Sequence, residues 1–334
     1  MLHLTSTVVI TNMKAITTRN YGAPSVLALE EVEKPTPKEN EILVKVRTTA
    51  VTSGDARIRA LNVPFGFKFI TRLLFGFSKP KQPILGGVFS GLVESVGKDV
   101  SEFVVGDEVF GASEKLGCHA EYVSIPEKGA ITIKPKNISF DEAAALPFGA
   151  LTSLKYLRDL GKIKRGQKVL VNGASGALGV YGVQLAKYFG AEVTGVCSSS
   201  NVELIKSLGA DEVIDYSTAD FTKNGKTYDI IYDTVGKISF KQSKDSLNEK
   251  GLFLQAAAGL SEYFKVLVTS FGSKKKIVAG VAMFNKTDLD VIKDLAISGA
   301  IVPVIGKRFP LSETAEAHTY VDTGHKVGSA VVVI

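Results

Sequence analysis

The segment that decides the fold is Lys168-Val-Leu-Val-Asn-Gly-Ala-Ser-Gly-Ala-Leu-Gly179, followed by the amphipathic run 180–187. A short β-branched strand leads into glycines, and the glycines lead into a helix. Glycine lets the backbone turn tightly and approach a pyrophosphate, whose charge then lies at the positive end of the helix. Ala174 holds the first place of the usual G-x-G-x-x-G pattern, and Gly176 and Gly179 hold the other two. The flanking strand and helix favour a dinucleotide site over a glycine-rich turn that binds nothing.

The end of the next predicted strand, 192–197, bears on the choice of nucleotide. About 20 residues after the glycines, an NAD enzyme usually places Asp or Glu on the ribose 2′-hydroxyl. Here the sequence is Cys197-Ser-Ser-Ser-Asn201, which offers hydroxyl and amide donors and no carboxylate to repel a 2′-phosphate. We therefore predict NADPH as the cofactor, with NADH as the weaker candidate. The same polar residues suit the cap of a helix over 202–208, and the two roles are compatible.

Composition bounds the class of protein. A chain of 334 residues is expected to form two domains, and 45% hydrophobic and 22% charged residues are typical of a globular protein. Two cysteines exclude a disulfide framework and predict a reducing, cytoplasmic location. The net charge of +6 comes from scattered lysines with no basic stripe, which argues against nucleic acid. No apolar run reaches the roughly 18 residues of a transmembrane helix, and residues 1–12 lack the features of a signal peptide.

The chain changes its pattern twice. From Met13 to about Ala145, short strands and turns predict a mostly antiparallel, barrel-like domain. Between about Pro147 and Val281, strands alternate with helices, which predicts a doubly wound parallel sheet. Its strands are expected at 169–171, 192–196, 212–215, 229–232, 251–255 and 276–280. A helix over 289–298 and strands near 301–305 and 329–333 are expected to return to the first domain. We therefore predict an α/β fold, with a discontinuous domain over 1–146 and 283–334 and a Rossmann domain over 147–282.

An ordered series of short motifs runs through the sequence. They are Gly22 to Leu27 with Pro35-x-Pro37, Gly86-Gly-Val-Phe-Ser-Gly-Leu-Val-Glu-Ser-Val-Gly97, Val105-Gly-Asp-Glu-Val-Phe-Gly111, Ala120-Glu-Tyr-Val123, Ala143-Ala-Ala-Leu-Pro147, Gly209-Ala-Asp-Glu-Val-Ile-Asp-Tyr216, Asp233-Thr-Val-Gly236 and Gly324-His-Lys-Val-Gly328. With the glycine segment, this series resembles the medium-chain dehydrogenase/reductase superfamily, in its zinc-free quinone oxidoreductase (zeta-crystallin-like) branch. The resemblance covers nearly the whole chain from Met13. It implies that the barrel-like domain is a GroES-like catalytic domain.

The positions of the catalytic zinc can be compared one by one. Zinc alcohol dehydrogenases of this superfamily carry Cys-x-x-Asp, then Gly-His-Glu-x-x-Gly, then a Cys on a later helix. Here the ligand positions hold Thr52, Gly87 and Phe148. A catalytic zinc needs about three N, S or O protein ligands, so we predict no metal. Cys118 and His119 point to opposite faces of a strand and are expected to serve packing.

Without a metal, direct alcohol oxidation lacks its Lewis acid. Hydride transfer to an electron-poor acceptor, such as a quinone or an α,β-unsaturated carbonyl, needs mainly positioning and hydrogen bonds to the developing oxyanion. Zinc-free relatives often carry Asn at the place of Thr52, whose hydroxyl can donate one hydrogen bond. We name Thr52 as the candidate catalytic residue, with a packed strand residue as the alternative, and Phe65, Phe89 and Phe148 as candidates for the substrate pocket. The aromatic and basic run 61–77 suits a lid over an apolar acceptor, ordinary core packing, or a membrane-surface segment.

The resemblance also implies the contacts of the cofactor. It places Thr152 beside the carboxamide, the glycine segment under the pyrophosphate, and Lys326 near the 2′-phosphate, where an ordinary surface lysine is the alternative. The full set of candidate cofactor residues is Thr152, Gly173, Ala174, Ser175, Gly176, Ala177, Leu178, Gly179, Ser198, Ser199, Tyr216, Val235, Ala257, Ala258, Val281, Met283 and Lys326.

These observations predict an NADPH-dependent, zinc-independent reductase of quinones or activated enones, with a small-molecule substrate. The alternatives are an enoyl-thioester reductase, a zinc-type alcohol dehydrogenase and a non-catalytic NADPH-binding protein. The apolar edge strand 276–280 predicts a homodimer, and the family resemblance points the same way. The lysines at 274–276 could instead keep that edge unpaired.

Overall fold

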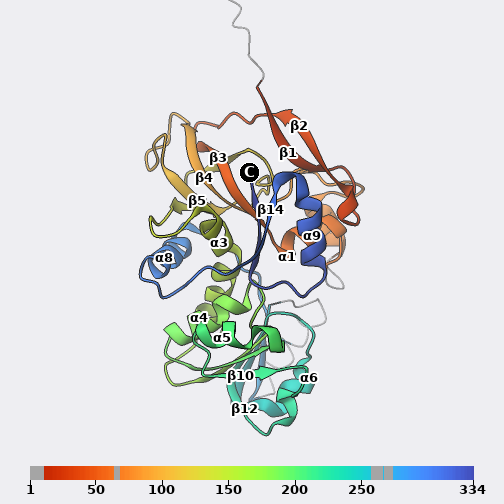
Figure 1. The fold of residues 1–334 in the computed structure, drawn as a ribbon, viewed down its shortest axis with the longest axis vertical. Helices are drawn as coiled ribbons and strands as arrows, with labels where there is room; N and C mark the ends of the chain where they lie inside the picture. Colours follow the sequence, from red (N-terminus) through yellow and green to blue (C-terminus); the bar gives the residue numbers. More distant parts are fainter. Residues whose placement is uncertain (1–10, 64–67, 257–265, 267–273) are drawn as a thin grey trace, which may run out of the picture.

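Two β-sheets organise the molecule and lie at opposite ends of it (Figure 1). The computed structural model describes residues 11–63, 68–256, 266 and 274–334. The upper sheet in Figure 1 is built from the first and last parts of the chain, and the lower one from its middle. Phe65, Ala257 and Ala258 lie outside the described residues. Within the described part, no helix combines the length and hydropathy needed to cross a bilayer.

The first sheet has seven strands in the order β14-β15-β3-β4-β5-β7, with β6 also paired to β3. A separate hairpin joins β1 and β2. All pairs are antiparallel except β14 with β15. The last two strands of the chain therefore complete the sheet that the N-terminal strands begin. The bounds are β1 (Asn12–Thr18), β2 (Leu27–Glu33), β3 (Glu41–Val51), β4 (Val88–Val96), β5 (Glu108–Ala112), β6 (Tyr122–Pro126), β7 (Ala130–Ile133), β14 (Ile305–Pro310) and β15 (Ser329–Val333).

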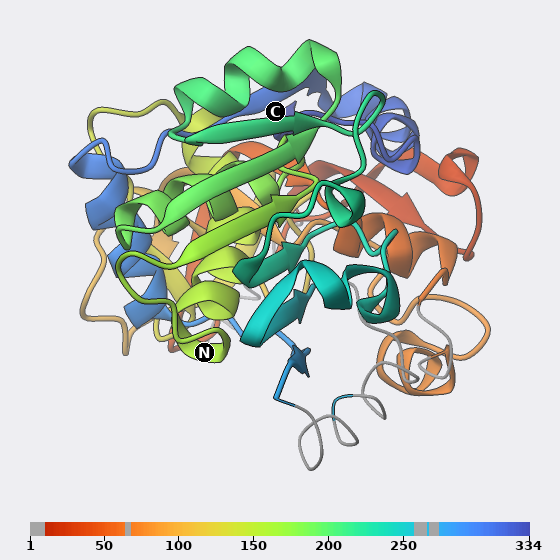
Figure 2. The same cartoon turned by 90° about the horizontal axis from the view of Figure 1, so that it is seen from below.

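The second sheet has six parallel strands in the order β10-β9-β8-β11-β12-β13. This is the doubly wound order of a dinucleotide-binding domain, which confirms the predicted sheet. Val169, Val171, Ile230 and Tyr232 are fully buried in its core, as expected for strands covered on both faces. Figure 2 shows this sheet from below, with β8 to β12 in green to teal and β13 in blue. The bounds are β8 (Lys168–Asn172), β9 (Glu192–Cys197), β10 (Glu212–Asp215), β11 (Tyr228–Asp233), β12 (Leu247–Gln255) and β13 (Lys276–Val278).

Helix α3 (Phe140–Leu154) connects the two sheets and positions much of the site. It begins with a capping box in which Ser139 and Glu142 satisfy each other's backbone N–H groups. Nearly all of its residues after Glu142 are buried, because it packs on both sheets. The other helices are α1 (Ser53–Ala60), α2 (Lys68–Phe75), α4 (Gly179–Tyr188), α5 (Val202–Ser207), α6 (Phe240–Ser243), α8 (Lys286–Ile297) and α9 (Thr314–Asp322).

The strand expected near 301–305 is displaced, since β14 runs from Ile305 to Pro310. The backbone before it is already engaged elsewhere. The N–H of Ile301 donates to the Leu295 carbonyl and closes the end of α8. Both backbone groups of Val302 pair with the side-chain amide of Gln184 in α4. The apolar residues of this stretch fit a strand as well as the end of a helix, so the sequence pattern alone could not tell the two apart.

Candidate functional site

The glycine segment forms a tight turn between β8 and α4. Gly173 adopts a left-handed backbone with φ +77°, which favours glycine. A Cβ on Gly179 would lie 2.1 Å from the Gly173 carbonyl oxygen, whereas a Cβ on Gly176 would meet nothing closer than 3.5 Å. Gly179 thus serves the close packing of the turn, and Gly176 leaves its outer side open. This open cradle before the N-terminus of α4 fits a pyrophosphate.

Helix α3 supports this turn from beneath. A Cβ on Gly149 would lie 2.1 Å from the carbonyl oxygen of Ala177, so the helix and the turn are in close contact. The hydroxyl of Ser153 donates to the Leu178 carbonyl at 2.9 Å. Thr152 lies beside these contacts at 8% exposure, and its hydroxyl donates to the Phe148 carbonyl. Helix α3 therefore links the predicted cofactor cradle with the predicted substrate pocket.

Ala174 holds the first glycine position, and its methyl group turns away from the cradle. It is fully buried in the core of the parallel sheet, and its Cβ lies 3.2 Å from the position of a Cβ on Gly195. Ala174 can therefore offer a cofactor only its backbone. A glycine is not needed there because the side chain has room on the core side.

The adenosine end of the site holds a carboxylate that the sequence-based argument missed. Ser198 and Ser199 follow β9, and Tyr216, 57% exposed, follows β10. Asp215 ends β10 in register with Cys197 of β9 and accepts a hydrogen bond from the Ser199 hydroxyl at 2.6 Å. This bond and those from Ser217 lower the pKa of Asp215, which is therefore ionised at neutral pH. Although 197–201 contain no acidic residue, Asp215 therefore places a negative charge at this end of the site.

Lys326 is connected to the glycine turn through Gly328, and its expected contact with the 2′-phosphate stays a prediction. Its ammonium donates to the Gly328 carbonyl at 2.9 Å, and the Gly328 N–H donates to the Ser175 carbonyl at 2.8 Å. Gly328 also forms a bridge with Gly176. The lysine is half-buried, and this burial lowers its pKa to about 8. This position suits a pyrophosphate oxygen.

Three apolar residues expected to contact the cofactor are exposed, and two of them, Val281 and Met283, were expected near the nicotinamide. Val281 and Met283 follow β13 with 71% and 67% of their surface accessible, and Val235 follows β11 with 39%. Asp233, at the end of β11, accepts hydrogen bonds from the N–H groups of Val235 and Gly236 and holds that loop in place. Its burial raises its pKa. Exposure of three apolar side chains at the carboxyl edge of the sheet is compatible with a bound ring, and their contact with the cofactor stays a prediction.

Thr52 is held differently from the expected hydrogen-bond donor. It caps α1, and its hydroxyl donates to Asp55 Oδ2 at 2.6 Å and accepts from the Asp55 N–H at 3.1 Å. A threonine hydroxyl has only one proton to donate, and Asp55 receives it. Asp55 Oδ1 in turn accepts from the Gly86 N–H at 3.1 Å. This geometry contradicts the predicted role of Thr52 as a hydrogen-bond donor to the substrate. In the structure, Thr52 fixes α1 and the segment before Gly87.

The three positions of the family's zinc ligands converge here. A Cβ on Gly54 would lie 3.3 Å from Thr52 Oγ1 and 3.8 Å from the Phe148 ring. Asp55 joins the same corner to Gly86, the neighbour of Gly87. In the parts of the chain that the structure describes, no group of three or more His, Cys, Asp or Glu side chains gathers as a metal site.

Phe89 does not line a pocket, which corrects a second prediction. Its ring is fully buried in the core of the first sheet together with Ile42, Val44 and Val109. Strand β4 is covered on both faces over this stretch, so its inward side chains meet the barrel core rather than the cleft. Phe148 is half-buried and does reach the Thr52 corner.

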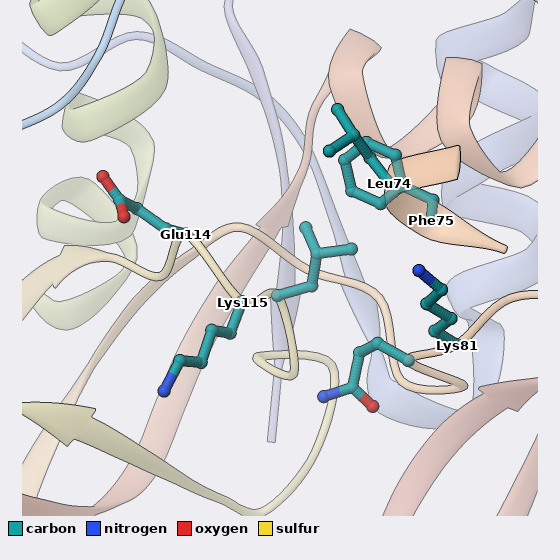
Figure 3. Close-up of a pocket in the computed structure, with 7 residues that line it drawn as sticks. Leu74, Phe75, Lys81, Glu114 and Lys115 are labelled. Carbon is teal, nitrogen blue, oxygen red and sulfur yellow. The ribbon is translucent and has the colours of Figure 1, made fainter. Parts of the chain in front are cut away.

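A cavity of about 350 Å³ opens beside Gly87 (Figure 3). Leu74 and Phe75 of α2 face the loop that carries Glu114 and Lys115 across it. Leu116 is part of its wall and lies 3.8 Å from the position of a Cβ on Gly87. The remaining lining residues are Lys81 and Gln82. The volume lies within the range of small-molecule pockets.

Sequence reasoning also missed a buried polar cluster behind this corner. His119 and His318 are both fully buried, with rings in T-shaped contact at 5.7 Å. Arg59 is 1% exposed and ion-paired with Asp322 at 2.6 Å. Arg59 Nε and Nη1, His119 Nε2 and both His318 nitrogens have no hydrogen-bond partner among the described residues. No sequence pattern connects positions this far apart along the chain.

Known proteins resemble this chain over its length. Residues 38–135 match the family described as alcohol dehydrogenase GroES-like domain, and residues 208–332 match that described as zinc-binding dehydrogenase. The chloroplast envelope quinone oxidoreductase homolog of Arabidopsis thaliana is 32% identical, with 96% of this chain and 98% of the relative covered. The chloroplastic NADPH-dependent alkenal/one oxidoreductase of the same plant is 31% identical, with 96% and 79% covered. The structure of the quinone oxidoreductase from Coxiella burnetii is 30% identical, has 97% and 100% covered, and gives a TM-score of 0.86.

A GroES-like sheet and a doubly wound sheet, with a glycine cradle held against the helix between them, define a class of nicotinamide-dependent oxidoreductases. The chain belongs to the medium-chain dehydrogenase/reductase superfamily, in its quinone oxidoreductase-like branch. The resemblance found in the sequence is thereby confirmed.

Proposed function

We propose that this protein is an NADPH-dependent, zinc-independent reductase that transfers hydride to quinones or activated α,β-unsaturated carbonyls. One observation carries the proposal: helix α3 holds the dinucleotide cradle at Gly149, and the nearby corner has Thr52, Gly87 and Phe148 where relatives bind zinc. None of these three offers a thiolate, imidazole or carboxylate. Two relatives whose names specify a quinone oxidoreductase homolog and an alkenal/one oxidoreductase support the acceptor class.

The bound cofactor would supply the hydride. We assign its pyrophosphate to the turn 173–179 and Lys326, and its nicotinamide to the region of Thr152, Val235, Val281 and Met283. Ser198, Ser199 and Tyr216 would surround the adenosine ribose. The name of the NADPH-dependent relative supports NADPH, and a 2′-phosphate would then bind donors of 198–201 despite Asp215 nearby. The proposed domains are 1–146 with 283–334, and 147–282.

We assign the acceptor to the cavity beside Gly87. Leu74, Phe75 and Leu116 give it apolar walls, which suit a flat, weakly polar molecule. Gln82 and Lys115 provide hydrogen-bond donors at the same cavity. The proton that completes the reduction is not assigned to Thr52, because its hydroxyl already donates to Asp55.

A panel of acceptors tests the proposal. Oxidation of NADPH is measured with a naphthoquinone, an alkenone and an enoyl thioester, and reduction of NADP⁺ with a secondary alcohol, before and after dialysis against a chelator. We expect turnover of the quinone or the alkenone and no change after dialysis. Alcohol oxidation that follows the zinc content would establish the zinc-type alternative, and absence of all turnover would establish a non-catalytic binding protein.

A pair of glycine variants tests the cradle separately from the chemistry. Gly176→Ala places a methyl group where the structure has open space, so we expect unchanged thermal stability and at least about tenfold weaker NADPH binding. Gly179→Ala would overlap the Gly173 carbonyl, so it should lower thermal stability. Tight NADPH binding by a stable Gly176→Ala protein would place the cofactor elsewhere.

A further inference from the structure

The short helix α2 carries an apolar surface that the rest of the protein leaves uncovered. Phe69, Leu73 and Leu74 are 66%, 55% and 62% exposed, and Phe77, just after the helix, is 55% exposed. Large apolar side chains are normally scattered singly over a soluble surface, whereas a cluster marks an interaction site. Figure 2 shows this orange helix at the periphery of the molecule. We call these four residues the α2 patch.

The α2 patch is continuous and firmly supported. The rings of Phe69 and Phe77 are in T-shaped contact at 5.9 Å, and Leu73 lies one helical turn from Phe69. Behind the patch, the Lys81 ammonium donates to the Leu73 carbonyl at 2.7 Å, and the Tyr21 hydroxyl donates to the Gly76 carbonyl at 2.8 Å. Polar contacts thus hold the end of the helix while its apolar side chains face outward.

The charged residues that α2 and its neighbouring segments contribute are all cations, although Glu114 of another loop lies across the cavity from Leu74. No Asp or Glu occurs in the sequence between Asp55 and Glu94, whereas that stretch contains the cations Arg57, Arg59, Lys68, Arg72, Lys79 and Lys81. Lys68 and Lys79 are exposed and flank the four patch residues along the chain. Apolar side chains flanked by lysine and arginine are typical of a segment that lies in the interface of a membrane with anionic lipids. A second copy of this chain is a poorer match, because a two-fold contact would bring the same cations together.

We propose that the α2 patch docks this protein onto the surface of an anionic lipid bilayer. Phe69, Leu73, Leu74 and Phe77 enter the boundary between headgroups and acyl chains, and Lys68 and Lys79 meet the lipid phosphates. Leu74 also lines the cavity beside Gly87 (Figure 3), so docking brings the opening of that cavity to the membrane. An apolar acceptor dissolved in the bilayer could then enter without crossing water; this consequence rests on the proposed function, and the docking does not.

Co-sedimentation with lipid vesicles tests the docking. The full chain is mixed with vesicles of phosphatidylcholine alone or with phosphatidylglycerol added, at low and high salt. We expect binding to the anionic vesicles and at least about tenfold weaker binding to phosphatidylcholine vesicles or at high salt, since screening removes the attraction of the lysines. Binding to neither type of vesicle at low salt would overturn the proposal.

Two double variants locate the contact, each with a matched control. Phe69→Gln with Leu73→Gln removes apolar surface that does not line the cavity, and Val104→Gln with Val105→Gln changes residues that are 64% and 62% exposed elsewhere. Lys68→Glu with Lys79→Glu reverses the charge beside the patch, and Lys128→Glu with Lys136→Glu reverses two other exposed lysines. We expect only the variants at the patch to lose at least about tenfold in vesicle binding. The charge variant decides the matter if the apolar one fails to fold.

The outcomes separate this inference from the proposed function. Equal vesicle binding by the patch variants and their controls would overturn the docking surface. A change of molecular mass in light scattering, confined to the patch variants and without vesicle binding, would assign the patch to a second copy and also overturn it. Vesicle binding by a protein that reduces neither quinones nor enones would support the docking proposal and refute the proposed function.

Discussion

The buried histidine pair should make the protein sensitive to mild acid. His318 is fully buried, and neither of its ring nitrogens has a hydrogen-bond partner among the described residues. Burial, followed by the charges of His119 and Arg59, lowers its pKa to about 2. The imidazole is thus neutral in the folded protein, whereas in the unfolded chain it takes up a proton below a pKa of about 6.5.

The sign and size of the effect follow from this difference. A folded-state pKa below the unfolded one contributes stability that is present above pH 6.5 and lost as the pH falls toward the folded value. At pH 5, about 1.5 units below the unfolded pKa, one such histidine costs about 2 kcal/mol of unfolding free energy. Burial also lowers the pKa of His119, against the opposing charge of Asp55, so the pair should lose at least this amount. Carboxylates contribute less, because unfolded Asp and Glu titrate near pH 4.

The measurement is urea unfolding at pH 7.5 and pH 5 of the wild type, His318→Gln and His325→Gln. His325 is an exposed histidine near the same end of the chain and serves as the control. We expect the drop in unfolding free energy between the two pH values to be about 2 kcal/mol smaller in His318→Gln than in the other two proteins. The comparison uses only this drop, so a general destabilisation by the substitution does not affect it. Equal drops in all three proteins, or a folded-state NMR titration of His318 near pH 6.5, would refute the reasoning.

Three further predictions concern the cofactor and the assembly. Because the pKa of Lys326 is about 8, the NADPH dissociation constant should rise with pH above 8, by up to about tenfold per unit. Lys326→Arg keeps its charge and should remove that rise in a fluorescence titration. An identical rise in the variant would show that Lys326 does not contact the pyrophosphate. Asp215→Asn removes a charge beside Ser199 and should raise the preference for NADPH over NADH, because a carboxylate repels a 2′-phosphate; an unchanged ratio from paired titrations would place the 2′-phosphate elsewhere. Light scattering should give about twice 35.6 kDa, and Val278→Asp on the edge strand should shift the mass to the monomer; a monomeric wild type would contradict this.

The parallel sheet could be predicted from the sequence because each of its elements has a local pattern. Short apolar β-branched runs alternate with helical segments, and β10 has the very bounds expected for it. The capping box at Thr52 could also have been found, since Thr52-Ser-Gly-Asp55 has the spacing of a helix start with an acidic third residue. That spacing would have shown that the Thr52 hydroxyl is engaged. The sequence could not show whether Phe89 lies in the core or in a pocket, because the alternation of residues along a strand is the same in both cases.

The features of the cofactor site that the sequence did not reveal have a common physical origin in how neighbouring strands end. A fingerprint counts residues along one strand, whereas parallel strands place their carboxyl ends side by side, so that Asp215 reaches Ser199 from a different strand. The same holds for the C-terminal segment. Gly328 pairs with the glycine turn, and the next residue, Ser329, begins β15 of the first sheet and donates to the Ala145 carbonyl of α3. One short segment therefore connects the cradle to both the barrel and the connecting helix. A movement of one sheet relative to the other must displace the cradle as well, so cofactor affinity and the relative position of the two sheets are coupled.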